Sequence, residues 1–241
     1  MSLVELLVGM FLSSILLTGI VQIAAGARNM FRLQESLAEL QESGRFAIDS
    51  IGTILRQAAY SPEPWGEMFP PTGFTAETAD NVNGRGDRLA VRTWSDRNCL
   101  DNPNPVTDAA GLPKFYLRES VLELGADANL THTCRYGPAA NQFVNQLQRQ
   151  GLVQNAEALE IRYAEDTDGD GQADRWVGGG EWNTESDVLA VQLALLLASH
   201  DAVSDASRRT YEVLDRIIEA PADGKLRRVL TYTHALRGRH Q

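Results

Sequence analysis

The first sixty residues constrain this chain most, because they join a lipid-compatible segment to an amphipathic one without a proline. Residues 6–25 form an apolar run interrupted by four polar side chains, and about twenty apolar residues are long enough for one helix to cross a bilayer. After residue 26 the chain becomes polar, and larger apolar side chains recur at steps of three and four residues, which is typical of a helix with one packed face. We predict one helix over residues 1–60, with a transmembrane half (1–25) and an amphipathic half (26–60).

The amphipathic half predicts a packed stripe that a globular domain must cover. We expect the helix to end at Ser61-Pro62, because proline disfavours helix at the residue before it. Residues 61–87 are rich in turn-forming residues and are expected to be a surface connection, held against the domain by Trp65, Phe69 and Phe74. The stripe consists of Met30, Leu33, Leu37, Leu40, Ala47, Ile48, Ile51, Ile54, Leu55 and Ala58.

Glu5 is the one charged side chain between residue 3 and Arg28. A carboxylate near the apolar end of a transmembrane helix is costly unless it is protonated or paired, so it indicates a function. The alternative is a glutamate at the headgroup boundary, half solvated.

A cleaved signal peptide is a rival explanation for the whole segment, but such a peptide carries a basic start, a shorter apolar core and a small-residue cleavage site. Here no Lys or Arg precedes Arg28, and the apolar run passes directly into the amphipathic half.

Two sets of residues carry a family resemblance. The run Ser2-Leu3-Val4-Glu5-Leu6-Leu7 resembles the mature N-terminus of type IV pilins and type II secretion pseudopilins. Residues 32–34, 40–47 (Leu-Gln-Glu-Ser-Gly-Arg-Phe-Ala) and 55–60 (Leu-Arg-Gln-Ala-Ala-Tyr) are similar to the PilW family of minor pilins. In that family a prepilin peptidase removes a short basic leader and the new terminus is methylated. Met1 stands where members usually carry Phe, so it is either the processed end or a start residue.

The resemblance implies a non-enzymatic minor pilin that takes part in type IV pilus assembly. Glu5 would pair with the residue-1 amine of a neighbouring subunit, here Met1. The implied partners are other minor pilins, the major pilin and the inner-membrane assembly platform. The implied location is the bacterial inner membrane, with a periplasmic domain, and then the base or tip of the pilus. The alternatives are a minor pseudopilin of a type II secretion system and a membrane-tethered calcium-binding adhesin.

Composition and cysteine spacing limit the function classes. The net charge of −10 argues against nonspecific nucleic-acid binding, which depends on Lys and Arg neutralising phosphates. Residues 61–241 are sufficient for one globular domain with one core. Cys99 and Cys134 match no zinc or C-x-x-C spacing, and an anchored, outward-facing domain would expose them to an oxidising compartment, so we predict one disulfide. A pair of buried free thiols is the alternative.

Short alternating segments separated by turns predict an antiparallel sheet, and with the long helix an α+β fold. Residues 187–199 are the expected central strand, with Leu189, Val191, Leu193, Leu195 and Leu197 on the face that receives the helix. A buried helix is the competing assignment. A short strand is also predicted around residues 211–214, and the basic residues of the last strand predict a charged sheet edge. The other predicted strands cover residues 88–94, 115–124, 131–136, 159–163 and 226–237.

Residues 166–177 contain alternating carboxylates with glycine at the sixth position, as in an EF-hand-type calcium loop. The twelfth position is Val177 instead of a bidentate glutamate, so Glu165, Glu181 or water would have to complete the shell. A solvated acidic turn is the alternative to a calcium site. The predicted ligands are Asp166, Asp168, Asp170, Gln172 and Asp174.

An enzyme hypothesis uses two of the same residues. In haloacid-dehalogenase-type phosphatases, an Asp-x-Asp-Gly segment after a strand supplies a nucleophile and an acid/base, here Asp166 and Asp168. We reject it because Asp170 occupies a position where those enzymes favour a small residue, and because no βαβ framework follows. Apart from this segment, the sequence contains no Gly-x-Ser-x-Gly, His-Glu-x-x-His or Walker-type motif.

Overall fold

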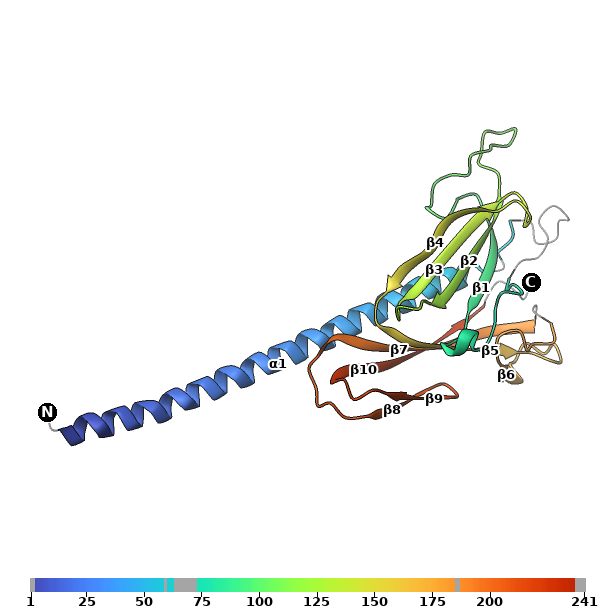
Figure 1. Ribbon diagram of the computed structural model, residues 1–241. Coiled ribbons are helices and arrows are strands. Elements are labelled where there is room, and N and C mark those ends of the chain that lie inside the picture. The colour runs from blue at the N-terminus through green and yellow to red at the C-terminus, as the bar shows by residue number, and fades with distance from the viewer. Residues whose placement is uncertain (1–2, 59, 63–72, 185–186, 237–241) are drawn as a thin grey trace.

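A computed structural model describes residues 3–58, 60–62, 73–184 and 187–236 (Figure 1). Its dominant element is α1 (Leu3–Gln57), one continuous helix of 55 residues, roughly 80 Å long at 1.5 Å per residue. Figure 1 shows its N-terminal half projecting away from the strands and its C-terminal half lying against them. The predicted single helix is confirmed, although it ends at Gln57, a few residues before the proline.

The strands form two four-stranded antiparallel sheets and a hairpin, which confirms the α+β prediction. The first sheet has the order β1-β2-β3-β4, the second has the order β10-β7-β5-β6, and β8 pairs with β9. The first sheet consists of β1 (Leu89–Ser95), β2 (Tyr116–Leu124), β3 (Leu130–Gly137) and β4 (Val144–Val153). The second consists of β5 (Ala156–Glu165), β6 (Arg175–Val177), β7 (Val188–Ala202) and β10 (Lys225–Ala235), and the hairpin of β8 (Arg209–Val213) and β9 (Arg216–Ala220).

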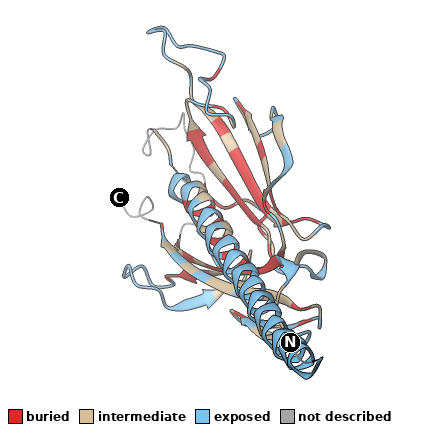
Figure 2. Ribbon diagram, turned by 90° about the vertical axis from the view of Figure 1, so that its left-hand side faces the viewer, coloured by how far each residue is buried: buried red, intermediate tan, exposed pale blue. Residues whose placement is uncertain are grey.

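The main core lies between α1, the face of β7 that was predicted to receive it, and the first sheet. Leu193, Leu195 and Leu197 of β7 are at most 1% exposed and belong to one cluster with residues of α1. The helix contributes Leu40, Ala47, Ile51 and Leu55 to that cluster. Figure 2 shows that burial on α1 is confined to the part beside the strands.

The predicted stripe is wrong at its beginning. Met30 is 55% exposed, because the helix reaches the domain only near Ser36, the first buried residue of α1. Leu37 is 42% exposed, because it lies off the buried face formed by Ser36, Leu40, Gly44 and Ala47. The three- and four-residue spacing therefore begins before there is a sheet to cover it.

The hairpin β8–β9 covers the opposite face of the second sheet. Leu196, the large residue on the otherwise small face of β7, is buried with Ala158, Ala194 and Val213 in a second cluster. The expectation of a single core was therefore wrong for the described residues. The sequence indicated a short strand near residues 211–214, but its partner β9 and strand β4 were not predicted. Strand β9 has only five residues, and β4 alternates weakly and carries mostly exposed side chains.

The connection after α1 is described only in part. Trp65 and Phe69 lie outside the described residues. Phe74 is 4% exposed and its ring meets Tyr163 edge-on, with ring centroids 5.0 Å apart, as predicted for a residue that holds the connection against the domain. At the other end of the chain, β10 forms the predicted sheet edge.

Candidate functional site

The projecting half of α1 is the largest exposed apolar surface that the structure describes. Side chains from Leu3 to Ile23 are exposed along its length. The helix is long and apolar enough to cross a membrane, with a mean hydropathy of 2.2 in its most apolar 18-residue window and none of that window buried. A core helix of a soluble domain would be covered, so this exposure separates α1 from that class.

Glu5 lies in the first turn of α1 and is exposed. The partial positive charge of a helix N-terminus favours a carboxylate at this position. Met1, the other residue predicted to act in subunit assembly, lies outside the described residues, so the pairing of Glu5 with a residue-1 amine stays a prediction.

The acidic loop joins β5 to β6, between strands as expected from its flanks. Asp166 is 4% exposed. One of its carboxylate oxygens accepts the N–H of Gly169 at 2.7 Å and the other accepts the N–H of Gly171 at 2.8 Å. Desolvation raises the pKa of Asp166, but these backbone donors and that of Asp168 outweigh it and lower the pKa below its usual value. Asp166 is therefore ionised and turned into the loop.

The structure brings together three of the five predicted calcium ligands. Carboxylate oxygens of Asp166, Asp168 and Asp174 lie within 4.8 Å of one another. Asp174 accepts hydrogen bonds from the hydroxyl and the N–H of Thr167, which lower its pKa. Asp170 instead accepts the side-chain amide N–H of Gln172 at 3.0 Å.

The fit of this loop to a calcium ion is partial. Three carboxylates are oxygen donors of the kind that calcium prefers, but calcium takes six to eight oxygens. Glu165 is engaged elsewhere, because its oxygens accept from Arg175 at 2.8 Å and from the N–H of Asn183. Glu181 accepts the N–H of Gly178. Neither glutamate belongs to the carboxylate group of the loop, so backbone carbonyls and water would have to complete the shell.

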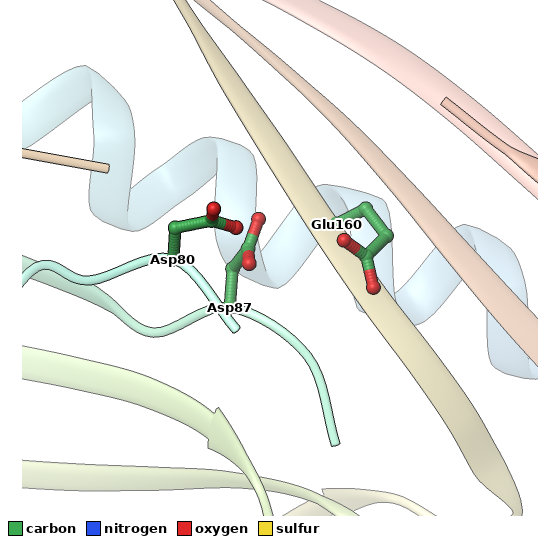
Figure 3. A group of neighbouring side chains, drawn as sticks. All are labelled: Asp80, Asp87 and Glu160. Atoms are coloured by element: carbon green, nitrogen blue, oxygen red, sulfur yellow. The ribbon is translucent and has the colours of Figure 1, made fainter. Parts of the chain in front are cut away.

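A second carboxylate group was not found from the sequence. Asp80, Asp87 and Glu160 offer oxygens that lie within 4.8 Å of one another (Figure 3). Burial raises the pKa of Asp87 to about 7, with smaller contributions from a hydrogen bond to Asp80 and the charge of Glu160. Burial also raises the pKa of Glu160, against the lowering effect of Arg216. Glu160 lies more than seventy positions after Asp80 and Asp87, so no local motif could indicate the group.

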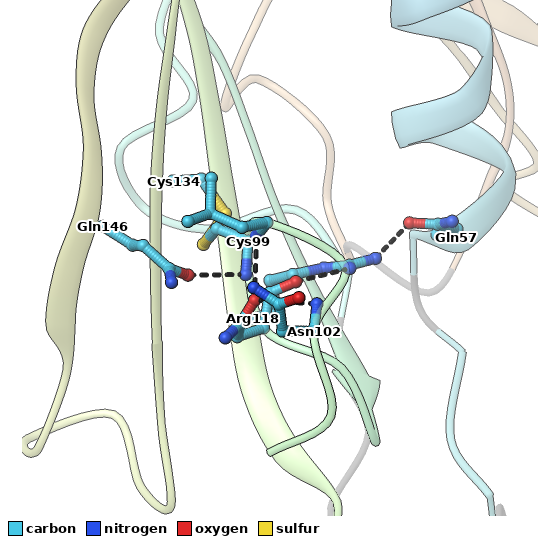
Figure 4. Close-up of a disulfide and its surroundings, with 8 residues drawn as sticks. Gln57, Cys99, Asn102, Arg118, Cys134 and Gln146 are labelled. Carbon is cyan, nitrogen blue, oxygen red and sulfur yellow. Dashed lines mark hydrogen bonds between the residues drawn. A yellow bond between two sulfur atoms is a disulfide. The ribbon is translucent and has the colours of Figure 1, made fainter. Parts of the chain in front are cut away.

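Cys99 and Cys134 form a disulfide that joins the loop after β1 to strand β3, with a sequence separation of 35. The surroundings in Figure 4 connect this loop to the end of α1. The N–H of Cys99 donates to Gln146 of β4 at 2.9 Å, and the guanidinium of Arg118 donates to both Asn98 of the loop and Gln57 of α1. The disulfide therefore lies beside the junction of the helix with the first sheet.

Comparison with known proteins finds similarity to pilus proteins. A family model described as type IV pilus-assembly protein W (PilW) matches residues 130–238. Among solved structures, the chain is similar to the type IV-like pilin TTHA1219 from Thermus thermophilus, with 17% sequence identity and a TM-score of 0.47, over 83% of this chain and 94% of that one. No curated protein sequence matches this chain. The part of the chain over residues 130–238 is therefore similar to type IV pilus-assembly protein W.

Proposed function

We propose that this chain is a minor pilin that takes part in the assembly of a type IV pilus. The observation that supports this most is the combination of an exposed apolar helix, whose one charge before Arg28 is Glu5, with a domain that matches the pilus-assembly protein W family. An exposed face of this kind needs lipid or neighbouring helices to cover it. The proposed role is structural and involves no catalysis.

The projecting helix has two successive surroundings in this proposal. Residues 1–25 hold the subunit in the inner membrane before assembly, with residues 61–241 in the periplasm. In the filament, the same residues pack against helices of other subunits, and Glu5 pairs with the residue-1 amine of a neighbour. Both surroundings are apolar, so in each of them an isolated carboxylate is unfavourable and a paired one is tolerated.

The partners in this proposal are other minor pilins, the major pilin and the inner-membrane assembly platform, with a prepilin peptidase acting beforehand. The domain would meet other minor pilins in a complex that primes the filament and stays at its base or tip. Arg228 is exposed on β10, which is an edge strand of the second sheet, and a charge there discourages unselective strand pairing.

We also propose that the loop over residues 166–177 binds calcium through Asp166, Asp168 and Asp174. Asp170 and Gln172 would contribute after their mutual hydrogen bond breaks. The support is the close approach of three carboxylates on a loop in which Gly169 and Gly171 adopt positive φ angles of 80°. Calcium would neutralise this charge and fix the turn between β5 and β6.

Deletion of the gene in the bacterium that encodes it, followed by complementation, tests the proposed function. We expect loss of surface pili with normal secretion of exported proteins, and recovery of pili with the intact gene. Normal pili with defective secretion would contradict the proposal and favour a pseudopilin. Normal pili and secretion with weaker surface attachment would contradict it and favour an adhesin.

A further inference from the structure

A groove of about 600 Å³ lies where the C-terminal half of α1 passes β10 (Figure 1). Ile48 of α1 and Leu230 and Tyr232 of β10 line it, and each of the three is half-buried. The contact between the helix and the second sheet therefore leaves an apolar surface that these three side chains cover only in part.

Three arginines surround this apolar surface. Arg45 and Arg56 come from α1 and Arg228 comes from β10, and all three are exposed. A Cβ built at Gly52 would lie 3.3 Å from a guanidinium nitrogen of Arg56 and 4.0 Å from the ring of Tyr232. The charged group of Arg56 and this ring therefore lie on the same side of the helix, at the groove.

The three arginines have no ionic partner in the part of the chain that the structure describes. Arg56 donates to the hydroxyl of Thr53 at 2.7 Å, and neither it nor Arg45 or Arg228 forms an ion pair with a described carboxylate. Arginines of β1, β3 and β5, in contrast, pair with carboxylates. The groove therefore holds guanidinium groups that are free to bind an anion.

The charge of the groove is opposite to that of the whole chain. Asp49 is the one carboxylate in the lining, so three guanidinium groups against one carboxylate leave an excess of positive charge. The chain as a whole carries a net charge of −10. An acidic partner is therefore repelled by the chain in general and attracted at this groove, which favours one specific mode of docking.

The shape of the groove suits an extended segment better than a helix. From Gln41 to Arg56, which both line the groove, α1 advances roughly 22 Å. A volume of about 600 Å³ over that length gives a mean cross-section of roughly 30 Å², whereas a helix about 10 Å across needs roughly 80 Å². An extended chain of about six or seven residues spans the same length.

The position of the groove along α1 argues against a lipid headgroup as its ligand. Arg45 lies about twenty residues beyond the apolar run that ends at residue 25, which is roughly 30 Å along the helix. The headgroup region extends only about 5–8 Å beyond the hydrocarbon core on each side. With the apolar run in the bilayer, the arginines lie beyond the reach of lipid.

We propose that this groove binds an extended acidic segment of another pilus subunit. Its carboxylates would pair with the three arginines, and its apolar side chains would cover Leu230 and Tyr232. Arginine suits this role because its planar guanidinium binds a carboxylate through two parallel hydrogen bonds. The charge match would select the partner and fix its register along α1. This inference rests on the proposed role in pilus assembly.

The first test identifies what lies in the groove. The photo-crosslinking residue p-benzoylphenylalanine replaces Gln41, an exposed residue of the lining, in the full chain in the bacterium that encodes it. After irradiation, mass spectrometry identifies the attached peptide. We expect a segment of another pilus subunit with several carboxylates among about six or seven residues. Attachment to lipid alone, to no pilus subunit, or to a segment without carboxylates would overturn the proposal.

Charge reversal then tests the arginines. In Arg45→Glu/Arg228→Glu the yield of this crosslink should fall by at least about tenfold, and lysine in place of the partner's acidic residues should restore it. Both arginines are exposed, so the thermal unfolding midpoint of the purified protein should stay unchanged. Arg209→Glu, at an exposed arginine of β8 outside the groove, is the matched control and should keep the wild-type yield. Equal yields in the two variants, or a loss that lysine in the partner does not restore, would overturn the proposal.

The groove and the pilus role fail in different ways. Loss of pili on deletion of the gene, together with a wild-type crosslink in Arg45→Glu/Arg228→Glu, would overturn the groove and leave the pilus role in place. Normal pili after deletion would overturn the pilus role, and the groove assignment with it.

Discussion

Leu230 of β10 packs directly against Gly44 of α1. A Cβ added at Gly44 would overlap the Cδ1 atom of Leu230, so the helix approaches the sheet at a position without a side chain. Gly44 lies between Leu40 and Ala47, which belong to the main core. This contact determines how closely the helix meets the second sheet.

Gly44→Val should therefore destabilise the domain, although valine is a better helix former than glycine. The added methyl groups must displace Leu230 or move the helix, and overpacking of this kind costs about 1–3 kcal/mol. Chemical denaturation of the full chain in detergent measures the loss in free energy of unfolding. Gly26→Val is the control, because a Cβ at Gly26 meets nothing within 4 Å. Equal stability of the two variants would show that the helix does not pack on β10 as described.

Removal of the disulfide should destabilise the domain without changing its fold. Closing a loop of 35 residues restricts the unfolded chain and contributes roughly 3–4 kcal/mol. Thermal unfolding of the protein with and without a reductant should show a lower midpoint in the reduced sample. The Cys99→Ser/Cys134→Ser variant should unfold at that lower midpoint in both buffers. A reductant-dependent midpoint in this variant would assign the effect to something other than the disulfide.

Acid should weaken the attachment of β10 through Asp223. Arg227 is 3% exposed along its side chain and pairs with Asp223 at 2.7 Å and with Glu157 at 2.6 Å. Its hydrogen bonds lower the pKa of Asp223 well below 3.8. A lowered pKa in the folded state means that the stabilisation is complete above about pH 4 and is lost as the pH falls further. Asp223→Asn should therefore reduce stability at pH 6 or so and have progressively less effect below about pH 4. The same loss at both pH values would contradict this assignment.

The long helix and the strand faces were predictable because both depend on local periodicity. The alternation of leucines in residues 187–199 identified β7 and the face that receives α1. The amphipathic spacing of α1, however, does not indicate where the domain begins, so Met30 was assigned to a packed face that it does not reach. It also does not fix the exact edge of the buried face, so Leu37, beside buried Ser36, was assigned to it as well. Strand β4 was not predicted, because its side chains are mostly exposed and its alternation is weak.

The candidate sites also differ in whether a local sequence pattern reveals them. The acidic loop is contiguous in sequence, so its ligand pattern could be recognised. Asp87 and Glu160 are brought together by the pairing of residues 87 and 159–161, which no local pattern encodes. Arg227 was assigned to a charged sheet edge together with Arg228, but its side chain is buried in ion pairs. A basic residue at an edge looks the same in sequence whether it faces solvent or a carboxylate.

Loss of the loop carboxylates should weaken calcium binding at residues 166–177. Asp168→Asn removes one of three clustered carboxylates while leaving the hydrogen bonds of Asp166 in place. In an Asp80→Asn background, calcium affinity of the loop should fall by about tenfold or more. Isothermal titration measures this, and Glu212→Gln, an exposed substitution on β8, is the control. Unchanged affinity would contradict calcium binding by the loop.

The central claim is that Glu5 serves subunit assembly. The most direct measurement is recovery of the Glu5→Ala protein in sheared pili or in complexes captured with another minor pilin, alongside its amount in the inner membrane. Glu35→Ala, an exposed glutamate further along α1, is the matched control. We predict normal membrane levels for both variants, with Glu5→Ala lost from pili and complexes and Glu35→Ala retained. Incorporation of Glu5→Ala at the wild-type level would contradict the account.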